Sequence, residues 1–251
     1  MTRLEPHILG NPPTEALPGE FTLTSWNVWF DRHLRAERNA ALLEELKPHR
    51  PHVMLFQEVT IPFVRALLAA DWLRDGYWIS GVEHNEIGVV MAARVSCESL
   101  NFHPLTSSMG RRLLVADLGS VRIAGAHFES VRGSGDIRAK QFAEAQAILD
   151  SATPAVLGGD FNCESAAPEC HILTGRDAWS ALQNTPGYTI DSEANPMLKR
   201  QRPTSVVQAR IDRILCFGQA EPLRTELLGT VPFQKDEYPS DHFGLLTQLK
   251  H

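Results

Sequence analysis

The sequence predicts an α/β fold in which two mixed β-sheets pack face to face with helices on the outside. Two observations predict it: apolar runs of strand length recur from end to end, and segments with helical periodicity fall between some of them. The chain has 251 residues, 43% of them hydrophobic, which is enough for one large core. We expect one domain over residues 21–251, behind an irregular lead-in at residues 1–20 that contains four prolines.

The first elements alternate between strand and helix patterns. Residues 21–28, FTLTSWNV, alternate as a strand does, and residues 32–47 have helical spacing that ends before Pro48. Residues 51–58, PHVMLFQE, are nearly all apolar, which is typical of a strand buried on both faces. Residues 61–73 indicate a second helix with a proline near its first turn.

The middle of the chain is predicted to be mainly strand. Residues 86–95, 111–119 and 120–128 are interpreted as successive antiparallel strands, with the sequence LGS as a tight turn before the last. Residues 135–150 then form an amphipathic helix. Its apolar side is predicted to contain Ile137, Phe142, Ala145 and Ile148.

Three further strands are predicted near the end of the chain. Residues 154–160, PAVLGGD, read as another buried strand. The pattern weakens over residues 164–207, where we expect long loops, and strands return at residues 209–218 and 242–249.

Composition narrows the function classes. The chain has 24 Lys and Arg against 30 Asp and Glu, a net charge of −6, which argues against a passive nucleic-acid binder because such proteins are basic. It permits an enzyme that meets phosphates in one local cleft beside a bound cation. The N-terminal segment lacks the apolar core of a signal peptide, and no segment approaches the length of a membrane span, so we expect a cytoplasmic protein without membrane contact.

The four cysteines, Cys97, Cys163, Cys170 and Cys216, contain no C-x-x-C pair. We interpret them as reduced thiols of a cytosolic protein. A soft-metal site built from Cys163, Cys170 and His171 is disfavoured, because structural zinc sites usually contain two closely spaced ligand pairs.

Polar residues stand where the apolar runs stop. They are Asn27, Glu58, His127, Asp160, Asn162, Asp212, Asp241 and His242. Each alone has an ordinary structural explanation, such as a turn cap or a local ion pair. Because loops at the ends of neighbouring strands gather at one rim of a fold, we expect the set to converge there.

These residue types favour phosphodiester hydrolysis. The chain has no G-x-S-x-G nucleophile motif, no G-x-x-x-x-G-K-[ST] phosphate loop and no H-E-x-x-H zinc motif. Carboxylate and amide oxygens suit a hard cation such as Mg²⁺, with Mn²⁺ as the alternative.

Roles follow from this chemistry. Glu58 would hold the metal, and Asp160 would take a proton from the attacking water. His242 would donate to the developing negative charge, positioned by either Asp212 or Asp241.

The remaining polar residues would orient the reactants. Asn27, His127 and Asn162 would hold phosphate oxygens or the water in line. Gly158 and Gly159 would let the backbone pack tightly or turn before the Asp-x-Asn pair, whose side chains would point the same way on an extended segment.

The motifs SWNV, LFQEV, AHFES, GGDFN, IDRI and SDHFGLL occur in the order found in the endonuclease/exonuclease/phosphatase superfamily, which the chain resembles from Phe21 to Leu249. The resemblance implies a metal-dependent phosphodiesterase. It also implies a four-layer α/β sandwich of two mixed β-sheets flanked by helices, as in the exonuclease III and DNase I type of fold.

A narrower resemblance connects the chain with the tyrosyl-DNA phosphodiesterase 2 family. MGRRLL followed by GAHFESVRGSGDIRAKQF, and GYTIDSEANPML before RIDRI, are similar to segments of those DNA repair enzymes. This implies Mg²⁺-dependent hydrolysis of 5′-phosphotyrosyl-DNA, or of another 5′-blocked end, to leave a 5′-phosphate. The expected partner is then a single-stranded DNA 5′ end, and we expect a monomer.

Residue roles carry over by motif. The resemblance implies that Glu58 binds the metal, together with Asn27 and Asp241. It implies catalytic roles for Asp160, His242, Asn162, Asn27, Asp212 and Asp241. It implies substrate contacts by His127, Ser130 and Arg111.

Two positions depart from the family pattern. Many superfamily members carry an Asp where this chain has Trp29, and the tyrosyl-DNA enzymes carry an Arg where it has Glu164. Trp29 would either stack on a base or aromatic ring of the substrate or cover the edge of the core.

Three function classes therefore remain open. The first is the tyrosyl-DNA phosphodiesterase or a close nuclease relative. The second is a small-molecule or lipid phosphodiesterase or phosphatase of the same superfamily, favoured by the acidic charge and Glu164. The third, a non-catalytic binding module, is disfavoured because such a module has no need of the complete polar set.

Overall fold

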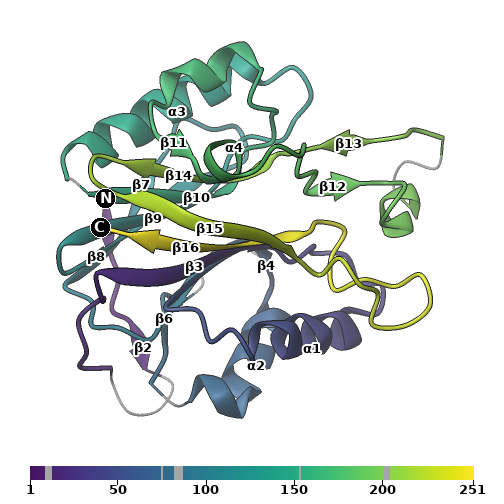
Figure 1. Cartoon of the computed structure of the whole chain (residues 1–251), viewed down its shortest axis with the longest axis horizontal. Coiled ribbons are helices and arrows are strands. Elements are labelled where there is room, and N and C mark those ends of the chain that lie inside the picture. The colour runs from purple at the N-terminus through teal and green to yellow at the C-terminus, as the bar shows by residue number, and fades with distance from the viewer. Residues whose placement is uncertain (9–12, 75, 82–86, 153, 201–203) are drawn as a thin grey trace.

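The computed structural model describes residues 1–8, 13–74, 76–81, 87–152, 154–200 and 204–251. Within them, two seven-stranded mixed sheets lie face to face in the middle of the molecule, and helices cover their outer faces (Figure 1). The layers follow the order helices, sheet, sheet, helices, which confirms the predicted fold class. None of the helices in these residues is both long enough and apolar enough to cross a membrane.

The first sheet contains strands from both the N-terminal and the C-terminal parts of the chain. Its strands in spatial order are β15 (Glu221–Leu228), β16 (Gly244–Lys250), β3 (Glu20–Asn27), β4 (Val53–Val59), β6 (Gly88–Ala93), β5 (Trp78–Ile79) and β2 (His7–Ile8). Helix α1 (Arg35–Leu46) connects β3 to its parallel neighbour β4. Helix α2 (Ile61–Ala69) follows, and the 3₁₀ turn η1 (Asp71–Leu73) comes after it.

The second sheet repeats this arrangement. Its strands in spatial order are β1 (Thr2–Arg3), β7 (Ser99–Pro104), β8 (Arg112–Leu118), β9 (Val121–His127), β10 (Ala155–Asp160), β14 (Asp212–Phe217) and β11 (Arg176–Asp177). Helix α3 (Gly135–Asp150) connects β9 to its parallel neighbour β10.

Short elements occur within and directly after residues 164–207, where long loops were predicted. They are η2 (Pro168–Ile172), α4 (Ala178–Leu182), β12 (Ile190–Asp191), η3 (Pro196–Arg200) and β13 (Gln208–Ala209). Strands β12 and β13 pair with each other as a small separate sheet.

Three apolar clusters hold the layers together. The largest lies between the sheets and includes Leu55, Leu114 and Ile123. A second packs α1 and α2 against the outer face of the first sheet, and a third packs α3 against the outer face of the second. Burial of apolar area stabilises these contacts by roughly 25 cal/mol per Å².

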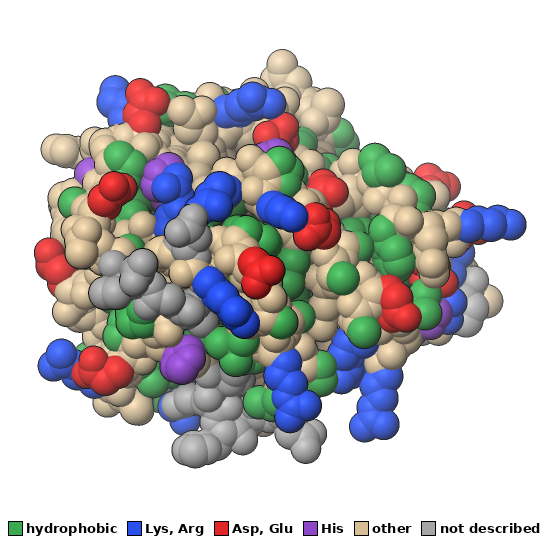
Figure 2. Space-filling view, turned by 90° about the horizontal axis from the view of Figure 1, so that it is seen from below, with side chains coloured by type: hydrophobic (Ala, Val, Ile, Leu, Met, Phe, Trp, Pro, Cys, Tyr) green, Lys and Arg blue, Asp and Glu red, His purple; other side chains and the backbone are tan. Residues whose placement is uncertain are grey.

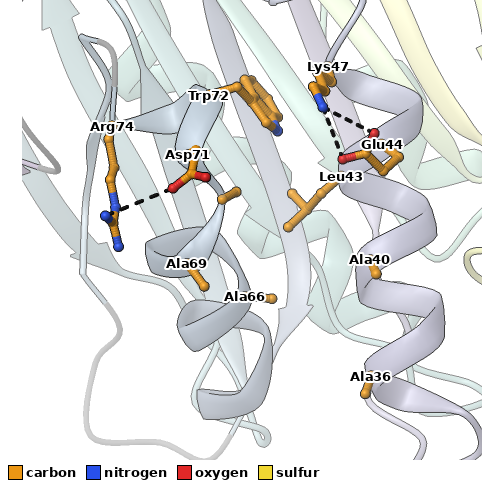
Figure 3. Close-up of a pocket in the computed structure, with 11 residues that line it drawn as sticks. Ala36, Ala40, Leu43, Glu44, Lys47, Ala66, Ala69, Asp71, Trp72 and Arg74 are labelled. Atoms are coloured by element: carbon orange, nitrogen blue, oxygen red, sulfur yellow. Dashed lines mark hydrogen bonds and ion pairs between the residues drawn. The ribbon is translucent and has the colours of Figure 1, made fainter.

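The surface over α1 and α2 is mixed in character. Figure 2 shows Lys and Arg side chains interspersed with Asp, Glu and hydrophobic side chains on this face. The small side chains of Ala36, Ala40, Ala66 and Ala69 leave a groove of about 880 Å³ between the two helices, with Trp72 at one end (Figure 3).

Two glycines at the end of β10 permit close backbone packing. A Cβ on Gly159 would lie 2.1 Å from the carbonyl oxygen of Ala126 in β9, and one on Gly158 would lie 2.7 Å from a methyl group of Leu55 in the facing sheet. The pair therefore allows tight packing within and between sheets, which is the first of the two predicted reasons for it.

The structure corrects the predicted order of the middle strands. Residues 88–93 lie in the first sheet beside β4, whereas β8 and β9 lie in the second, so the three predicted strands are not successive neighbours. Strands β8 and β9 pair antiparallel as predicted, but β7, the other neighbour of β8, was not predicted, and neither was β15. Glu86, the first residue of the predicted strand, lies outside the described residues.

Helix predictions need smaller corrections. The second helix ends at Ala69. On α3, Phe142 and Ala145 are buried as predicted, but the other buried positions are Gln141 and Leu149. Gln141 is buried because its side chain hydrogen-bonds the backbone N–H and the carboxylate of Glu129.

The lead-in also contributes to the sheets. Strands β1 and β2 add two-residue pairings to the edges of the second and first sheets, respectively. Residues 9–12 of the lead-in lie outside the described residues.

We predict that Gly159→Ala destabilises the protein by about 3 kcal/mol or more, because its Cβ would overlap backbone that cannot move without separating β9 from β10. Gly119→Ala is the matched control, since its φ of +69° strains an alanine but nothing lies within 4 Å of the new Cβ. We expect that control to cost about 1 kcal/mol in urea unfolding. Equal costs for the two variants would contradict the close packing at Gly159.

Candidate active site

The candidate site forms where the two parallel strand pairs end. In the second sheet, β10 lies between β9 and β14, and Asp160 is in register with His127 on one side and with Asp212 on the other. Three polar side chains from distant parts of the sequence thus end adjacent strands in one row. Ligand sites of α/β sheets commonly lie outside the carboxyl ends of strands in this way.

The first sheet supplies Asn27 and Glu58 to the same rim. Asn27 ends β3, and its register partner in β4 is Gln57, directly before Glu58. A register shift in the pairing of β4 with β6 spans the position of Glu58, whose φ is +57°. Such bulges re-aim a side chain, and strained backbone of this kind is typical of functional sites.

A hydrogen bond joins the two sheets at this rim. Nδ2 of Asn27 donates to Oδ2 of Asp160 at 3.0 Å, and both residues are buried. The Oδ1 atom of Asn27 accepts from the backbone N–H of Trp29. Both ends of the amide are engaged, so the side chain of Asn27 is held in a fixed orientation.

The Asp-x-Asn pair is not extended as predicted. Strand β10 ends at Asp160, and Asn162 adopts a φ of +52°. The Asn162 backbone N–H donates to Oδ1 of Asp160 at 2.9 Å, and its side chain donates to the carbonyl of Phe128. The turn therefore directs the backbone N–H of Asn162 at the carboxylate of Asp160, whereas the two side chains were predicted to point the same way.

His242 pairs with Asp212, which settles an open alternative. Nδ1 of His242 lies 2.8 Å from Oδ2 of Asp212, whereas Asp241 borders the cavity instead. The backbone carbonyl of His242 accepts from the indole N–H of Trp26. Asp212 therefore holds the imidazole through Nδ1, and Trp26 holds the backbone of His242, which leaves Nε2 for the cavity that His242 lines.

The two histidines are shifted in opposite directions. Burial lowers the pKa of His242, but the charge and hydrogen bond of Asp212, with Asp241 and Asp160 nearby, outweigh it and raise that pKa well above its usual value. Burial and the positive charges of Arg111 and His242 lower the pKa of His127 well below its usual value. One imidazole is charged and the other neutral near pH 7.

Two buried carboxyl groups have raised pKa values. Burial, reinforced by the charge of Asp212, raises the pKa of Asp160 to about 7. Burial, reinforced by Glu58, raises the pKa of Asp241 to about 6. Burial and the neighbouring carboxylates both disfavour the ionised forms, and a bound cation would favour them.

A cavity of about 240 Å³ connects the predicted metal and catalytic residues. Glu58, Asp160, Asn162, Asp241 and His242 all line it. Its other lining residues are Trp29, Phe30, Ser130, Ile190, Leu198 and Ile211. The cavity offers the carboxylates of Glu58, Asp160 and Asp241, a donor set that fits Mg²⁺ with part of its water shell.

The tightest cluster of ligand-type residues lies beside this cavity. Among the residues that the structure describes, Asp160, Asp212 and His242 are the group whose ligand atoms lie within 4.8 Å of one another. Asp212 raises the pKa of His242 well above its usual value, which favours a proton held between these two residues over a metal ion. Glu58 and Asp241 lie outside this close group, but both line the cavity.

Arg111, His127 and Ser130 form the predicted substrate-side group. Nη1 of Arg111 lies 3.0 Å from Nδ1 of His127, and its Nη2 donates to Ser130 at 3.3 Å. Because the guanidinium can only donate, Nδ1 of the neutral imidazole accepts, and its Nε2–H faces Asp160 at 3.5 Å. The group brings a cation to a site rich in carboxylates.

Trp29 is largely buried, which favours the core-edge interpretation over an exposed stacking platform. It is only 3% exposed and packs with Met197, Tyr238 and Phe243. The guanidinium of Arg38 lies 4.4 Å from its ring centroid.

Two positioning residues were missed in the sequence. Arg38, fully buried in α1, donates to the carbonyls of Val28 and Trp29 and so holds the segment after Asn27. Ser240 donates to the carbonyl of Asn27 at 2.6 Å and accepts from the backbone N–H of His242. In the sequence, Ser240 could have been identified because it directly precedes Asp241 and His242. Nothing in the sequence distinguishes Arg38 from other polar residues of its helix.

The sequence is similar to those of known proteins. A model of the Endonuclease/Exonuclease/phosphatase family matches residues 24–242. The chain is 28% identical over 251 residues to Tyrosyl-DNA phosphodiesterase 2 of Homo sapiens, covering 91% of this chain and 68% of that protein. It is 30% identical over 247 residues to the protein of that name from Xenopus laevis, covering 90% of this chain and 65% of that protein. The chain thus spans about two thirds of the length of these curated relatives.

The fold is shared with a solved structure, D. rerio TDP2 complexed with single strand DNA product. It matches with a TM-score of 0.82 at 23% identity, covering 93% of this chain and 100% of that one. The two chains therefore share the same fold over nearly their whole lengths.

We predict that Asp212→Asn lowers the pKa of His242, since burial is then opposed only by the more weakly acting charges of Asp241 and Asp160. In the wild type, the folded protein holds this proton more tightly than the unfolded chain. The pair therefore contributes stability that is fully present below about pH 6.5 and is lost as the pH rises through the folded-state pKa.

NMR titration of the imidazole C–H signals measures this directly, with His127 as the internal comparison because its pKa is lowered in the wild type. An unchanged pKa of His242 in Asp212→Asn would show that Asp212 does not hold the proton.

Proposed function

The chain belongs to the endonuclease/exonuclease/phosphatase family as a phosphodiesterase-type hydrolase, and we propose that it cleaves 5′-phosphotyrosyl or otherwise 5′-blocked DNA ends with the help of Mg²⁺. The observation that carries the proposal is the single cavity shared by Glu58, Asp160, Asp241 and His242. The products are a free 5′-phosphate and the blocking group, which for a tyrosyl adduct is the phenol of tyrosine.

Glu58 and Asp241 would hold the metal ion at the cavity wall. When bound, Mg²⁺ supplies Lewis-acid polarisation of a phosphoryl oxygen and offsets the negative charge of the site. The other steps fall to side chains of the chain.

Asp160 accepts the proton of the attacking water. Its carboxylate is held by Asn27 on one oxygen and by the backbone N–H of Asn162 on the other, so its orientation is set before the substrate binds. A pKa raised toward neutrality suits a general base, because such a group is still ionised for a useful fraction of the time and binds the proton well once it takes it.

His242 stabilises the negative charge that develops on the phosphoryl group. Asp212 holds its Nδ1, which keeps the imidazole charged and leaves Nε2–H to donate into the cavity. A fixed cationic donor in a water-poor site stabilises the transition state without reorganisation.

The substrate class rests on the relatives and on the cationic side of the site. The curated relatives are tyrosyl-DNA phosphodiesterases by name, and the D. rerio structure holds a single strand DNA product. In this chain Arg111 and Ser130 lie beside the cavity, where they can contact the phosphate that follows the scissile bond or the scissile phosphate itself.

We predict that Asp160→Asn lowers kcat by about 10² to 10⁴-fold on an oligonucleotide that carries a 5′-tyrosyl or 5′-p-nitrophenyl phosphate, because the general base is lost. Release of tyrosine or p-nitrophenol measures the rate, and Asp136→Asn, an exposed change on α3, is the matched control. Equal turnover by wild type and Asp160→Asn would remove Asp160 from this role.

Glu58→Gln is expected to raise the Mg²⁺ concentration for half-maximal activity by at least about tenfold, since one negative ligand is lost. Glu164→Gln, an exposed glutamate outside the cavity, should leave that concentration unchanged. The measurement is turnover across a Mg²⁺ and Mn²⁺ series with EDTA as the blank. Full activity of the wild type in EDTA would contradict metal dependence.

Glu164 favours a second candidate, a small-molecule phosphodiesterase of the same family. It is exposed two residues beyond Asn162, where it would repel a DNA backbone. If the substrate is DNA, Glu164→Arg should lower KM for the 5′-tyrosyl oligonucleotide and steepen its salt dependence by about 0.7 in log–log slope, since one more phosphate is neutralised. Unchanged DNA kinetics together with faster turnover of a small phosphodiester would favour the second candidate.

A further inference from the structure

Two cysteine thiols lie in contact behind the active-site turn. Sγ of Cys163 is 3.1 Å from Sγ of Cys170, although seven residues separate them in the sequence. Cys163 is 7% exposed and directly follows Asn162, whereas Cys170 lies in η2 and is partly exposed. Among the described residues, Cys163, Cys170 and His171 do not form a group whose ligand atoms lie close enough to hold one metal ion. We therefore treat the two cysteines as a pair of thiols.

A buried arginine lies against both sulfur atoms. Nη1 and Nη2 of Arg213 lie 3.3 Å and 3.4 Å from Sγ of Cys170, and Nη2 lies 3.9 Å from Sγ of Cys163. Nη2 also donates to the carbonyl of Cys163, and the guanidinium stacks over the ring of Phe161 at 5.0 Å. Arg213 is 4% exposed, so its charge acts on the thiols with little screening by water.

We propose that Cys163 and Cys170 form an oxidation site, in which Cys170 reacts with a hydroperoxide and Cys163 then closes a disulfide. The geometry assigns the two roles. Cys170 is the sulfur that oxidant can reach from solvent and the one that Arg213 contacts with both terminal nitrogens. Cys163 is buried but already touches its partner, so it serves as the resolving thiol.

The proposed chemistry balances with hydrogen peroxide as oxidant. The Cys170 thiolate attacks one peroxide oxygen, the O–O bond breaks, and hydroxide leaves and takes up a proton, which yields the sulfenic acid and one water. The Cys163 sulfur then attacks the Cys170 sulfur, the S–O bond breaks, and a second water leaves with the Cys163 proton. Two thiols are oxidised to one disulfide, and the peroxide is reduced to two waters.

The electrostatics of the pair agree with this assignment. The hydrogen bond from Cys163 and the charge of Arg213 lower the pKa of Cys170 to about 6, against the opposing effect of burial. In contrast, burial raises the pKa of Cys97 to about 11 and of Cys216 to about 12. The chain thus carries two unreactive thiols as internal controls.

The disulfide would also move the active-site turn, a consequence that rests on the proposed function. A disulfide would shorten the distance between the two sulfur atoms from 3.1 Å to roughly 2 Å and so displace Cys163. The residue before it, Asn162, would move as well, and its backbone N–H is hydrogen-bonded to Asp160. Arg213, which follows Asp212, must also shift when its thiolate partner is lost. We therefore expect the oxidised protein to hydrolyse its substrate at least about tenfold more slowly, because misplacement of about 1 Å can cost up to 10²-fold.

The site itself is tested without any turnover. Wild type, Cys163→Ser and Cys170→Ser are treated with hydrogen peroxide, the remaining thiols are alkylated, and non-reduced peptides are mapped by mass spectrometry. We expect a Cys163–Cys170 disulfide in the wild type, sulfenic acid at Cys170 trapped by dimedone in Cys163→Ser, and slow oxidation of the remaining thiol in Cys170→Ser. Alkylation of Cys170 should be at least roughly tenfold faster than that of Cys97 or Cys216.

Absence of that disulfide, or oxidation of Cys97 or Cys216 as fast as of Cys170, would overturn the proposal. Because wild-type peptides give the result, it holds even if one variant folds poorly. Turnover of the 5′-tyrosyl oligonucleotide before oxidation, after it, and after reduction by dithiothreitol then tests the link to the active site. Equal turnover in all three states would overturn that link alone, and no turnover in any state would count against the proposed function and leave the peptide result standing.

Discussion

The hydrogen bond between Asn27 and Asp160 is the contact on which the candidate site depends. It joins the end of β3 in one sheet to the end of β10 in the other, in a region where neither side chain reaches bulk water. A buried amide and a buried carboxylate are stable there because they bond each other and because the backbone N–H groups of Trp29 and Asn162 satisfy their other oxygens. The contact therefore fixes the relative position of the two sheets at the rim and orients the proposed base with the same atoms. Gly158 and Gly159 permit that approach, since side chains at these positions would push away Leu55 and the backbone of β9.

The electrostatics of the rim explain why its parts have different roles. Four acidic side chains, Glu58, Asp160, Asp212 and Asp241, lie within or against one small cavity, and burial, reinforced by this crowding, raises the pKa values of Asp160 and Asp241. Three positive groups balance them in part: the His242 imidazolium, Arg111 beside the neutral His127, and Arg38 beneath the segment after Asn27. The charge that remains favours a cation and an incoming phosphoryl group together. Strained φ angles at Trp29, Glu58 and Asn162 are the conformational cost of aiming these side chains inward.

Much of this site could be predicted from the sequence, because the polar residues that end buried strands are easy to recognise. Asp160, His242 and Glu58 were predicted to meet, and they line one cavity. The failures have physical causes. Strand β15 contains Pro222 and alternating charges, which are tolerated only because it lies at a sheet edge. The turn at Asn162 depends on a left-handed backbone conformation, and the burial of Arg38 depends on carbonyl groups that fold back onto α1. Neither follows from local periodicity. The contact of Cys163 with Cys170 likewise depends on how η2 packs against α3, which no spacing rule predicts.

The central claim is that Asp160 and His242 act on the same phosphoryl group as one unit. A double-mutant cycle measures this most directly, with kcat/KM determined for wild type, Asp160→Asn, His242→Asn and the double variant on one 5′-tyrosyl oligonucleotide. Residues that act as a unit show strongly non-additive losses. The account predicts that the double variant is about as slow as the slower single variant. Losses that multiply in the double variant would show that the two residues act independently, and would contradict the shared site.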